Sequence, residues 1–233
     1  MIDPERSADP AIARRYAWGW GILLAMWVAA VKWGGLTGMD HAVAAWMDGI
    51  RSPALDTAAR AITFFGSTPW AVAMAAVMLL QWRARDEGSM AKIFLLAWAG
   101  GLALQVALRF AVGQLRPDAI IVINGPTLGL GLVAQYELRG FPSGHAFRAA
   151  FLYGWWSERL TERPAGFVAA VGCGFTILLV GLTRAYLSRH WMTDIVGAWL
   201  LALMVLSWAE ASRRSSTRFG SLGTAPSARR PAA

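Results

Sequence analysis

Long apolar runs alternate with short polar segments over most of this chain, and this pattern predicts a bundle of membrane-spanning helices. A helix needs about 20 largely apolar residues to cross the hydrocarbon core of a bilayer. Allowing for tilt and for interfacial ends, the pattern predicts six transmembrane helices at residues 16–33, 66–82, 91–113, 144–160, 166–183 and 191–209. We therefore expect an all-α integral membrane domain over residues 16–210.

The composition agrees with this class of protein. Hydrophobic residues make up 56% of the chain and charged residues only 15%, whereas soluble domains carry about 25% charged residues. The chain has 13 tryptophans, and those at predicted helix ends are typical of the aromatic belts at membrane interfaces. The N-terminal helix resembles a signal peptide in its layout, but its length favours a retained anchor.

Basic residues predict the orientation in the membrane. A six-helix topology places these on one side: Arg6, Arg14, Arg15, Arg83, Arg85, Lys92, Arg159, Arg163, Arg213, Arg214, Arg218, Arg229 and Arg230. The positive-inside rule makes this side cytoplasmic. We expect a cytoplasmic N-terminal segment (1–15) and a disordered basic cytoplasmic tail (211–233). The net charge of +8 is mostly of this flanking kind, so we expect no nucleic-acid partner.

Two polar clusters at predicted helix ends are suited to binding an anion. Arg109 and Arg116 are separated by nearly two helical turns, so a continuous helix would place both on one face. The motif at residues 141–145, Phe-Pro-Ser-Gly-His, has the composition of a helix N-terminus. The backbone N–H groups of Ser143 and Gly144 are therefore expected to face an anion.

A third cluster is suited to nucleophilic catalysis. Thr183 and Arg184 are followed by His190 and Asp194. On a helix, a carboxylate four residues after a histidine reaches its Nδ1–H and leaves Nε2 free. That arrangement prepares a histidine to act as a nucleophile or a base.

Each cluster alone has a simpler interpretation. A histidine such as His145 or His190 on an apolar helix is more often a packed structural residue. An arginine near a membrane helix end, such as Arg109, more often reaches the lipid headgroups. The occurrence of all three clusters favours one polar site, because ionisable groups are costly in a membrane unless they meet.

Together the clusters resemble the signature of the type-2 phosphatidic acid phosphatase superfamily: Lys-x6-Arg-Pro, Pro-Ser-Gly-His and Ser-Arg-x5-His-x3-Asp. Order and internal spacing match between residues 109 and 194. Two positions depart from the signature. Arg109 replaces the lysine and keeps its charge in a planar guanidinium, and Thr183 replaces the serine and keeps the hydroxyl. The compact chain looks more like bacterial members, which implies the inner (plasma) membrane with the site facing the periplasm.

The resemblance implies roles for the matching residues. His190 would attack phosphorus to form a phosphohistidine, Asp194 would orient His190, and His145 would protonate the leaving group and then activate water. The implied phosphate-binding groups are Arg109, Arg116, Arg184, Ser143 and Gly144. No metal or other cofactor is expected, because no carboxylate cluster or Cys/His ligand spacing accompanies these residues.

Residues outside the signature carry further expectations. Arg148, three positions after His145, should lie on the same helix face, lining the substrate pocket or pairing with an acid such as Asp194. Residues 39–64 would form either short interfacial helices or a loop packed on the bundle. The connection at 118–141 is long and is a candidate lid. His41 matches no position of the signature, and we interpret it as a surface residue.

The leading hypothesis is a metal-independent phosphatase for a phosphorylated membrane lipid. Candidate substrates are undecaprenyl pyrophosphate, phosphatidylglycerophosphate, phosphatidic acid and phosphorylated lipid A. One alternative is a phosphotransferase with an acceptor other than water, and another is a non-enzymatic lipid-binding relative. The intact set of His145, His190 and Asp194 favours an enzyme. The sequence makes no prediction of oligomeric state.

Overall fold

The protein is a bundle of long helices joined by short connections. The structure, a computed structural model, describes residues 9–120, 131–160 and 166–222. Its long helices are α2 (Pro10–Lys32), α5 (Thr68–Ala84), α6 (Gly88–Val112), α9 (Gly144–Leu160), α10 (Gly166–Tyr186) and α11 (Met192–Leu222). Each predicted transmembrane segment corresponds to one of these helices, so the all-α class is confirmed.

Fewer membrane crossings than long helices are supported by the length and composition of the helices. Within the part of the chain that the structure describes, three helices are long and apolar enough to span a bilayer, namely α6, α10 and the Met192–Ser216 part of α11. Two bent pairs raise the number to as many as five: α2 with α3 (Thr37–Gly49), bent by 83°, and the segment Pro53–Gly66 with α5, bent by 41°. Helix α9 has 17 residues, so the predicted six spans are not confirmed by length and composition.

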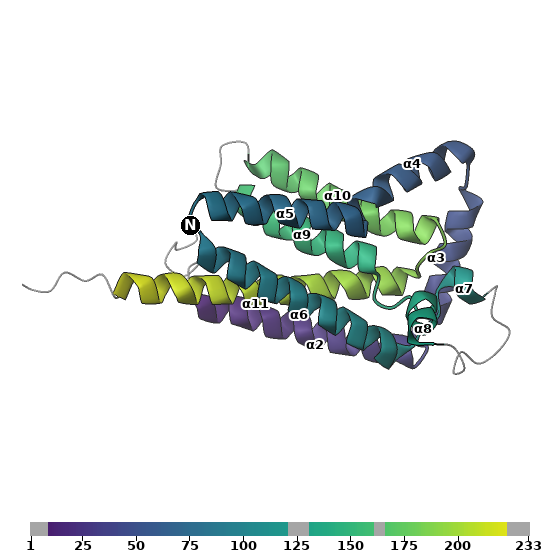
Figure 1. Cartoon of the computed structure of the whole chain (residues 1–233). Helices are drawn as coiled ribbons and strands as arrows, with labels where there is room; N and C mark the ends of the chain where they lie inside the picture. The colour runs from purple at the N-terminus through teal and green to yellow at the C-terminus, as the bar shows by residue number, and fades with distance from the viewer. Residues whose placement is uncertain (1–8, 121–130, 161–165, 223–233) are drawn as a thin grey trace, which may run out of the picture.

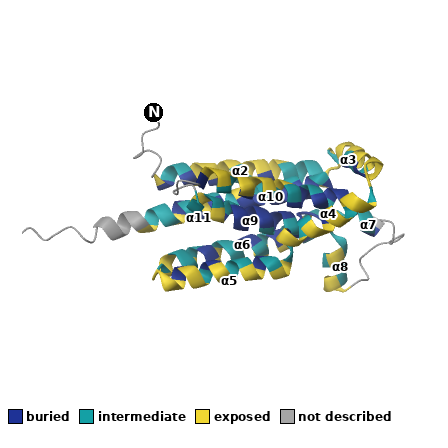
Figure 2. Ribbon diagram, turned by 90° about the horizontal axis from the view of Figure 1, so that it is seen from above, coloured by how far each residue is buried: buried dark blue, intermediate teal, exposed yellow. Residues whose placement is uncertain are grey.

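Helix α9 forms the centre of the bundle. Figure 2 shows it as the most continuously buried helix, with α10 and α11 beside it. Phe147 and Phe151 of α9 are 0% exposed, and Phe94 of α6 packs between Phe151 and Trp155. Such dense aromatic packing holds α9 rigidly, which fixes the position of its first turn.

The outer surfaces of the helices are apolar. Trp18 and Met26 on α2 and Trp33 at its end are 64%, 63% and 82% exposed. Large exposed apolar side chains of this kind are expected where lipid replaces water as the solvent. Helix α2 lies along α11 (Figure 1), and the first turn of α2 and the last turn of α11 are at the same end of the bundle.

Short helices gather at the opposite end. They are α3, α4 (Pro53–Thr63), the 3-10 turn η1 (Phe64–Gly66), α7 (Pro117–Ile120) and α8 (Leu132–Leu138). Of the two alternatives considered for residues 39–64, the structure shows short helices. Ser52 is the N-cap of α4. Its side chain accepts a hydrogen bond from Leu55 N–H, and Pro53 takes the first helical position. Much of the predicted lid, residues 121–130, lies outside the described residues.

Both ends of the helical domain differ from the prediction. Helix α2 begins at Pro10 because Asp9 caps it by accepting a hydrogen bond from Ala11 N–H. Helix α11 continues to Leu222, so residues 211–222 are not the disordered segment that we expected. Glu210 pairs with both Arg213 and Arg214 along this helix, and pairs at these spacings stabilise helices. Residues 223–233 lie outside the described part of the chain.

Candidate active site

The predicted pair of His190 and Asp194 forms in the structure. His190 Nδ1 lies 3.1 Å from Asp194 Oδ2, and both side chains are nearly or fully buried, at 5% and 0% exposure. The spacing argument assumed that His190 lies on a helix. In the structure, His190 instead precedes α11, and Asp194 lies in the first turn of that helix. Asp194 Oδ2 also accepts a hydrogen bond of 3.0 Å from Trp191 N–H, as an acidic side chain does in a capping box.

The turn that carries His190 is tied to the end of α10. The backbone N–H groups of Arg189 and His190 both donate to the Arg184 carbonyl, at 3.0 and 3.2 Å. The Arg184 side chain extends to the α4 end, where its Nη1 donates to Thr63 Oγ1 at 3.3 Å. Arg184 thus fixes the histidine turn through its backbone and brings a guanidinium to the same region.

Ser143 caps α9 and joins it to α11. Its Oγ accepts from Ala146 N–H at 3.5 Å, and its own N–H donates to the Asp194 carbonyl at 3.0 Å. The prediction that Ser143 N–H faces an anion is therefore wrong, because that donor already has a partner. The N–H groups of Gly144 and His145 precede the first intrahelical bond of α9, so they are the backbone donors suited to an anion.

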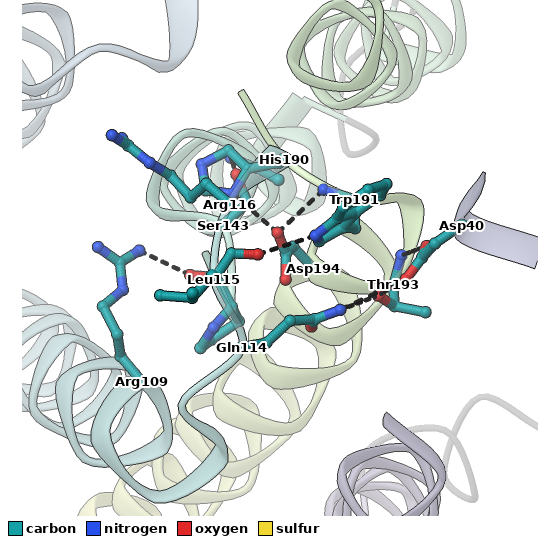
Figure 3. Close-up of polar contacts among 12 residues, drawn as sticks. Asp40, Arg109, Gln114, Leu115, Arg116, Ser143, His190, Trp191, Thr193 and Asp194 are labelled. Carbon is teal, nitrogen blue, oxygen red and sulfur yellow. Dashed lines mark hydrogen bonds and ion pairs between the residues drawn. The ribbon is translucent and has the colours of Figure 1, made fainter. Parts of the chain in front are cut away.

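The two arginines of the first cluster do not share a helix. Gly113, with a φ of 73°, ends α6 after Val112, as glycine in the left-handed conformation commonly does. Arg116 lies beyond this end, with its N–H bonded to the Leu138 carbonyl at 3.0 Å. The shared-face prediction is thus wrong. Figure 3 nevertheless shows Arg109 and Arg116 together around Ser143 and His190.

Arg109 and Arg116 are held differently. Arg109 is 7% exposed, donates to the Pro142 carbonyl at 2.9 Å, and stacks on Tyr136 with 4.3 Å between its Cζ and the ring centroid. Arg116 forms an ion pair with Asp118 at 3.3 Å. The Nε atom of Arg109 is buried without a hydrogen-bond partner among the described residues.

Arg148 lies beside His145, as its spacing predicted. Its Nη2 is 3.4 Å from His145 Nδ1, and its Nε donates to the Gly66 carbonyl in η1 at 3.0 Å. The pairing with Asp194 that we considered does not form in the structure, where the carboxylate of Asp194 is held by His190 and Trp191 N–H.

Several residues that support this site carry no motif in the sequence. Asp40 of α3 is 4% exposed; it accepts from Thr193 N–H at 3.0 Å and from Thr193 Oγ1 at 2.6 Å. Gln114 Nε2 bridges Asp40 Oδ2 and Thr193 Oγ1, at 3.4 and 3.3 Å (Figure 3). Asp40 thereby fixes the first turn of α11, which carries Asp194.

Gly140 and Trp191 close the site on the other side of the carboxylate. Gly140 N–H donates to the Gln114 carbonyl at 2.8 Å, and a Cβ at Gly140 would overlap Asp194 Oδ2. Trp191 Nε1 donates to the Leu115 carbonyl at 2.8 Å, and its ring packs edge-on against His41, which is exposed, as we expected of a surface residue. Among these supporting residues, only Gly140 had a signal in the sequence, namely its position next to the Phe-Pro-Ser-Gly-His motif.

The surroundings of His190 favour its neutral form. Burial lowers the pKa of His190 well below its ordinary value, and the positive charges of Arg184 and Arg109 lower the pKa further. A neutral imidazole has the lone pair that a nucleophile needs. Within the described ranges, no group of three or more His, Cys, Asp or Glu side chains is placed to hold a metal ion.

Comparison with known proteins identifies the class. The model of the PAP2 superfamily matches residues 90–217, a range that contains all the catalytic and phosphate-binding residues considered above. The chain therefore belongs to the PAP2 superfamily, the family that its motifs resemble, and is a membrane phosphatase by that membership.

Two relatives extend the similarity over nearly the whole chain. Phosphatidylglycerophosphatase B of Bacillus subtilis (strain 168) is 24% identical over 199 residues, which are 82% of this chain and 91% of the relative. The crystal structure of a transmembrane PAP2 type phosphatidylglycerolphosphate phosphatase from Bacillus subtilis has a TM-score of 0.64 at 21% identity. That match covers 91% of this chain and 98% of the crystallised chain, which supports the fold described here.

Proposed function

We propose that this protein hydrolyses a phosphate ester of a membrane lipid through a phosphohistidine on His190. The observation that carries the proposal is the buried contact of 3.1 Å between His190 Nδ1 and Asp194 Oδ2. The carboxylate holds the proton on Nδ1, so the lone pair of Nε2 is available for attack on phosphorus. Capping-box geometry keeps Asp194 in place for this role.

His145 is the proposed acid and base. In the first step, the Nε2–P bond of His190 forms while the bond from phosphorus to the leaving oxygen breaks, and His145 in its imidazolium form gives a proton to that oxygen and becomes neutral. In the second step, His145 takes a proton from water, which attacks the phosphohistidine and releases inorganic phosphate. The contact of Arg148 with His145 Nδ1 in the structure aims Nε2 away from Arg148.

Positive charge for the transferred phosphoryl group comes from arginine side chains. Phosphoryl transfer depends mainly on positioning and on neutralising the equatorial oxygens. Arg109 and Arg184 have no carboxylate within ion-pair distance among the described residues, whereas Arg116 pairs through its Nε with Asp118. The N–H groups of Gly144 and His145 add the positive end of α9. These groups would serve without a metal ion.

The proposed substrate is a phosphorylated lipid that enters from the outer leaflet. The site lies at the end of the bundle opposite the first turn of α2 and the last turn of α11 (Figure 1). Basic flanking residues predict that the termini are cytoplasmic, which would direct the site to the periplasm. Phosphatidylglycerophosphate, named for both relatives, is the first candidate, and undecaprenyl pyrophosphate, phosphatidic acid and lipid A phosphate are the others.

The test is phosphate release by purified protein from these lipids, with and without a chelator. We expect release that resists the chelator and is lost in His190→Ala. A matched control is His41→Ala, which changes a histidine at the same end of the bundle that has no role in the proposed reaction. Release that depends on added metal, or that persists in folded His190→Ala, would contradict the proposal.

A further inference from the structure

Two donors outside the family signature converge on Gly144. The position that a Cβ would occupy there lies 3.0 Å from Gln105 Nε2 and 3.1 Å from Arg148 Nη1. Gln105 is 2% exposed, and its Nε2 has no hydrogen-bond partner among the described residues. A buried amide donor left without an acceptor costs free energy, so an acceptor from a ligand would relieve that cost.

Arg148 supplies charge at the same place. Its Nε and Nη2 are engaged with Gly66 O and His145 Nδ1, which leaves Nη1 directed at Gly144. No ion pair links Arg148 to a carboxylate within the described ranges. Since a guanidinium stays protonated in proteins, Gln105 and Arg148 together form a donor pair with an uncompensated positive charge.

The backbone positions that carry this donor pair lie one helical turn deeper in the bundle than Arg109 and His145, and the two donors reach up to Gly144. Gln105 precedes Arg109 by four residues on α6, which runs toward the site, and Arg148 follows His145 by three residues on α9, which runs away from it. One turn is about 5.4 Å along a helix. A lipid in the outer leaflet directs its chains toward the bilayer centre, so donors that approach Gly144 from the deeper side come from the lipid side of the scissile bond.

We propose that Gln105 and Arg148 form a second anion subsite, which binds negative charge on the leaving group. The proposal rests on the proposed function, in which His190 attacks from one side and the leaving oxygen departs beside His145. In a lipid diphosphate, the bond from the terminal phosphorus to the bridging oxygen breaks, and its electron pair stays on the departing lipid monophosphate. In a phosphomonoester such as phosphatidic acid, the leaving group is an uncharged alcohol.

Two sources of leaving-group charge fit this subsite. The inner phosphate of a lipid diphosphate is adjacent to the scissile bond, whereas the phosphodiester of phosphatidylglycerophosphate lies across a glycerol from it. Two matched substrate pairs separate these sources: a prenyl diphosphate against its monophosphate, and phosphatidylglycerophosphate against phosphatidic acid with the same chains. Within each pair, the ratio of the two kcat/KM values reports the contribution of leaving-group charge.

The experiment compares these ratios in the wild type and in three variants. Arg148→Gln removes the charge but keeps a donor, Arg148→Lys keeps the charge, and Gln105→Leu removes the amide. Arg83→Gln is the control, because this exposed arginine lies at the opposite end of the bundle. Loss of a hydrogen bond to a charged group corresponds to a change of about 10- to 100-fold in kcat/KM. Arg148→Gln should therefore lower at least one ratio by about tenfold or more.

The outcomes distinguish the subsite from the proposed function. A selective fall of the diphosphate ratio, partly restored in Arg148→Lys, would assign the subsite to the inner phosphate of a diphosphate. A selective fall of the phosphatidylglycerophosphate ratio would assign it to the phosphodiester. Equal losses within each pair would overturn the subsite and leave Arg148 as a residue that only supports the fold. A wild-type protein that is folded and releases no phosphate from any of the four lipids would overturn the proposed function and, with it, the subsite.

Discussion

The carboxylate of Asp40 holds both the backbone and the side chain of Thr193, with bonds of 3.0 Å to its N–H and 2.6 Å to its Oγ1. Thr193 directly precedes Asp194. Asp40, which lies in the short helix α3 in the N-terminal third of the chain, therefore positions the first turn of α11. Asp40 lies outside the range that matches the family model. The N-terminal helices therefore supply part of the support for the proposed catalytic pair.

Replacing Asp40 tests this support. Asp40→Ala would leave the N–H and the hydroxyl of Thr193 buried without the carboxylate that accepts from them, at a cost of about 1–3 kcal/mol in stability. We expect kcat to fall by about tenfold or more with a smaller change in KM, because the proposed nucleophile is displaced rather than the lipid contacts. The measurements are steady-state kinetics and thermal unfolding in detergent. Asp48→Ala, on the exposed face of the same helix, should match the wild type, and equal kinetics in the two variants would contradict this role.

Gly140 gives a second test of the same carboxylate. A Cβ there would overlap Asp194 Oδ2 and approach Arg116 Cγ to 3.2 Å. Gly140→Ala should therefore push the carboxylate from His190 and lower kcat by about 100-fold. Gly131→Ala is the matched control, because a Cβ at that glycine meets nothing within 4 Å. Wild-type activity in Gly140→Ala would show that the carboxylate tolerates displacement.

The pH dependence of kcat/KM reports the charge around His190. Positive charge on Arg184 lowers the pKa of His190, so Arg184→Gln should raise that pKa. Since protonation removes the nucleophile as pH falls, the acidic limb of the profile should move to higher pH in the variant. The same profile measured for Arg83→Gln should overlay that of the wild type. An acidic limb that stays in place in Arg184→Gln, or moves to lower pH, would contradict the electrostatic role of Arg184.

Cysteine labelling tests the predicted orientation. Cys173 is the one cysteine of the chain, so Cys173→Ala provides a background for single cysteines. Asp48→Cys at the site end and Arg85→Cys at the opposite end both replace exposed residues. In intact spheroplasts, a membrane-impermeant maleimide should label the first and not the second. The reverse pattern would place the site on the cytoplasmic side.

The sequence predicted the helices well because each depends on a local apolar run of sufficient length. The predicted contact of His190 with Asp194 forms, but not in the way the prediction assumed. The prediction placed both residues on one helix, whereas in the structure His190 lies in the turn that precedes α11. The expectation for Arg109 and Arg116 failed at Gly113, whose left-handed conformation ends the helix between them. A glycine inside an apolar run does not by itself say whether a helix stops.

The supporting residues were beyond sequence reasoning because their partners are distant in the chain. Asp40 and Thr193 are separated by 153 positions, and nothing in the local pattern around either residue indicates the other. The partner of Arg148 was equally hidden, because it is a backbone carbonyl of η1 rather than an acidic side chain. Tertiary contacts of this kind are fixed by packing around α9, which the pattern of apolar residues does not specify.

The most direct test of the account is to trap the covalent intermediate. The protein is mixed briefly with a substrate that carries a radiolabelled terminal phosphate, quenched in alkali, and mapped by mass spectrometry. We predict alkali-stable, acid-labile phosphate on His190 that is absent in His190→Ala. Turnover without label on His190, or label that persists in His190→Ala, would contradict the proposed mechanism.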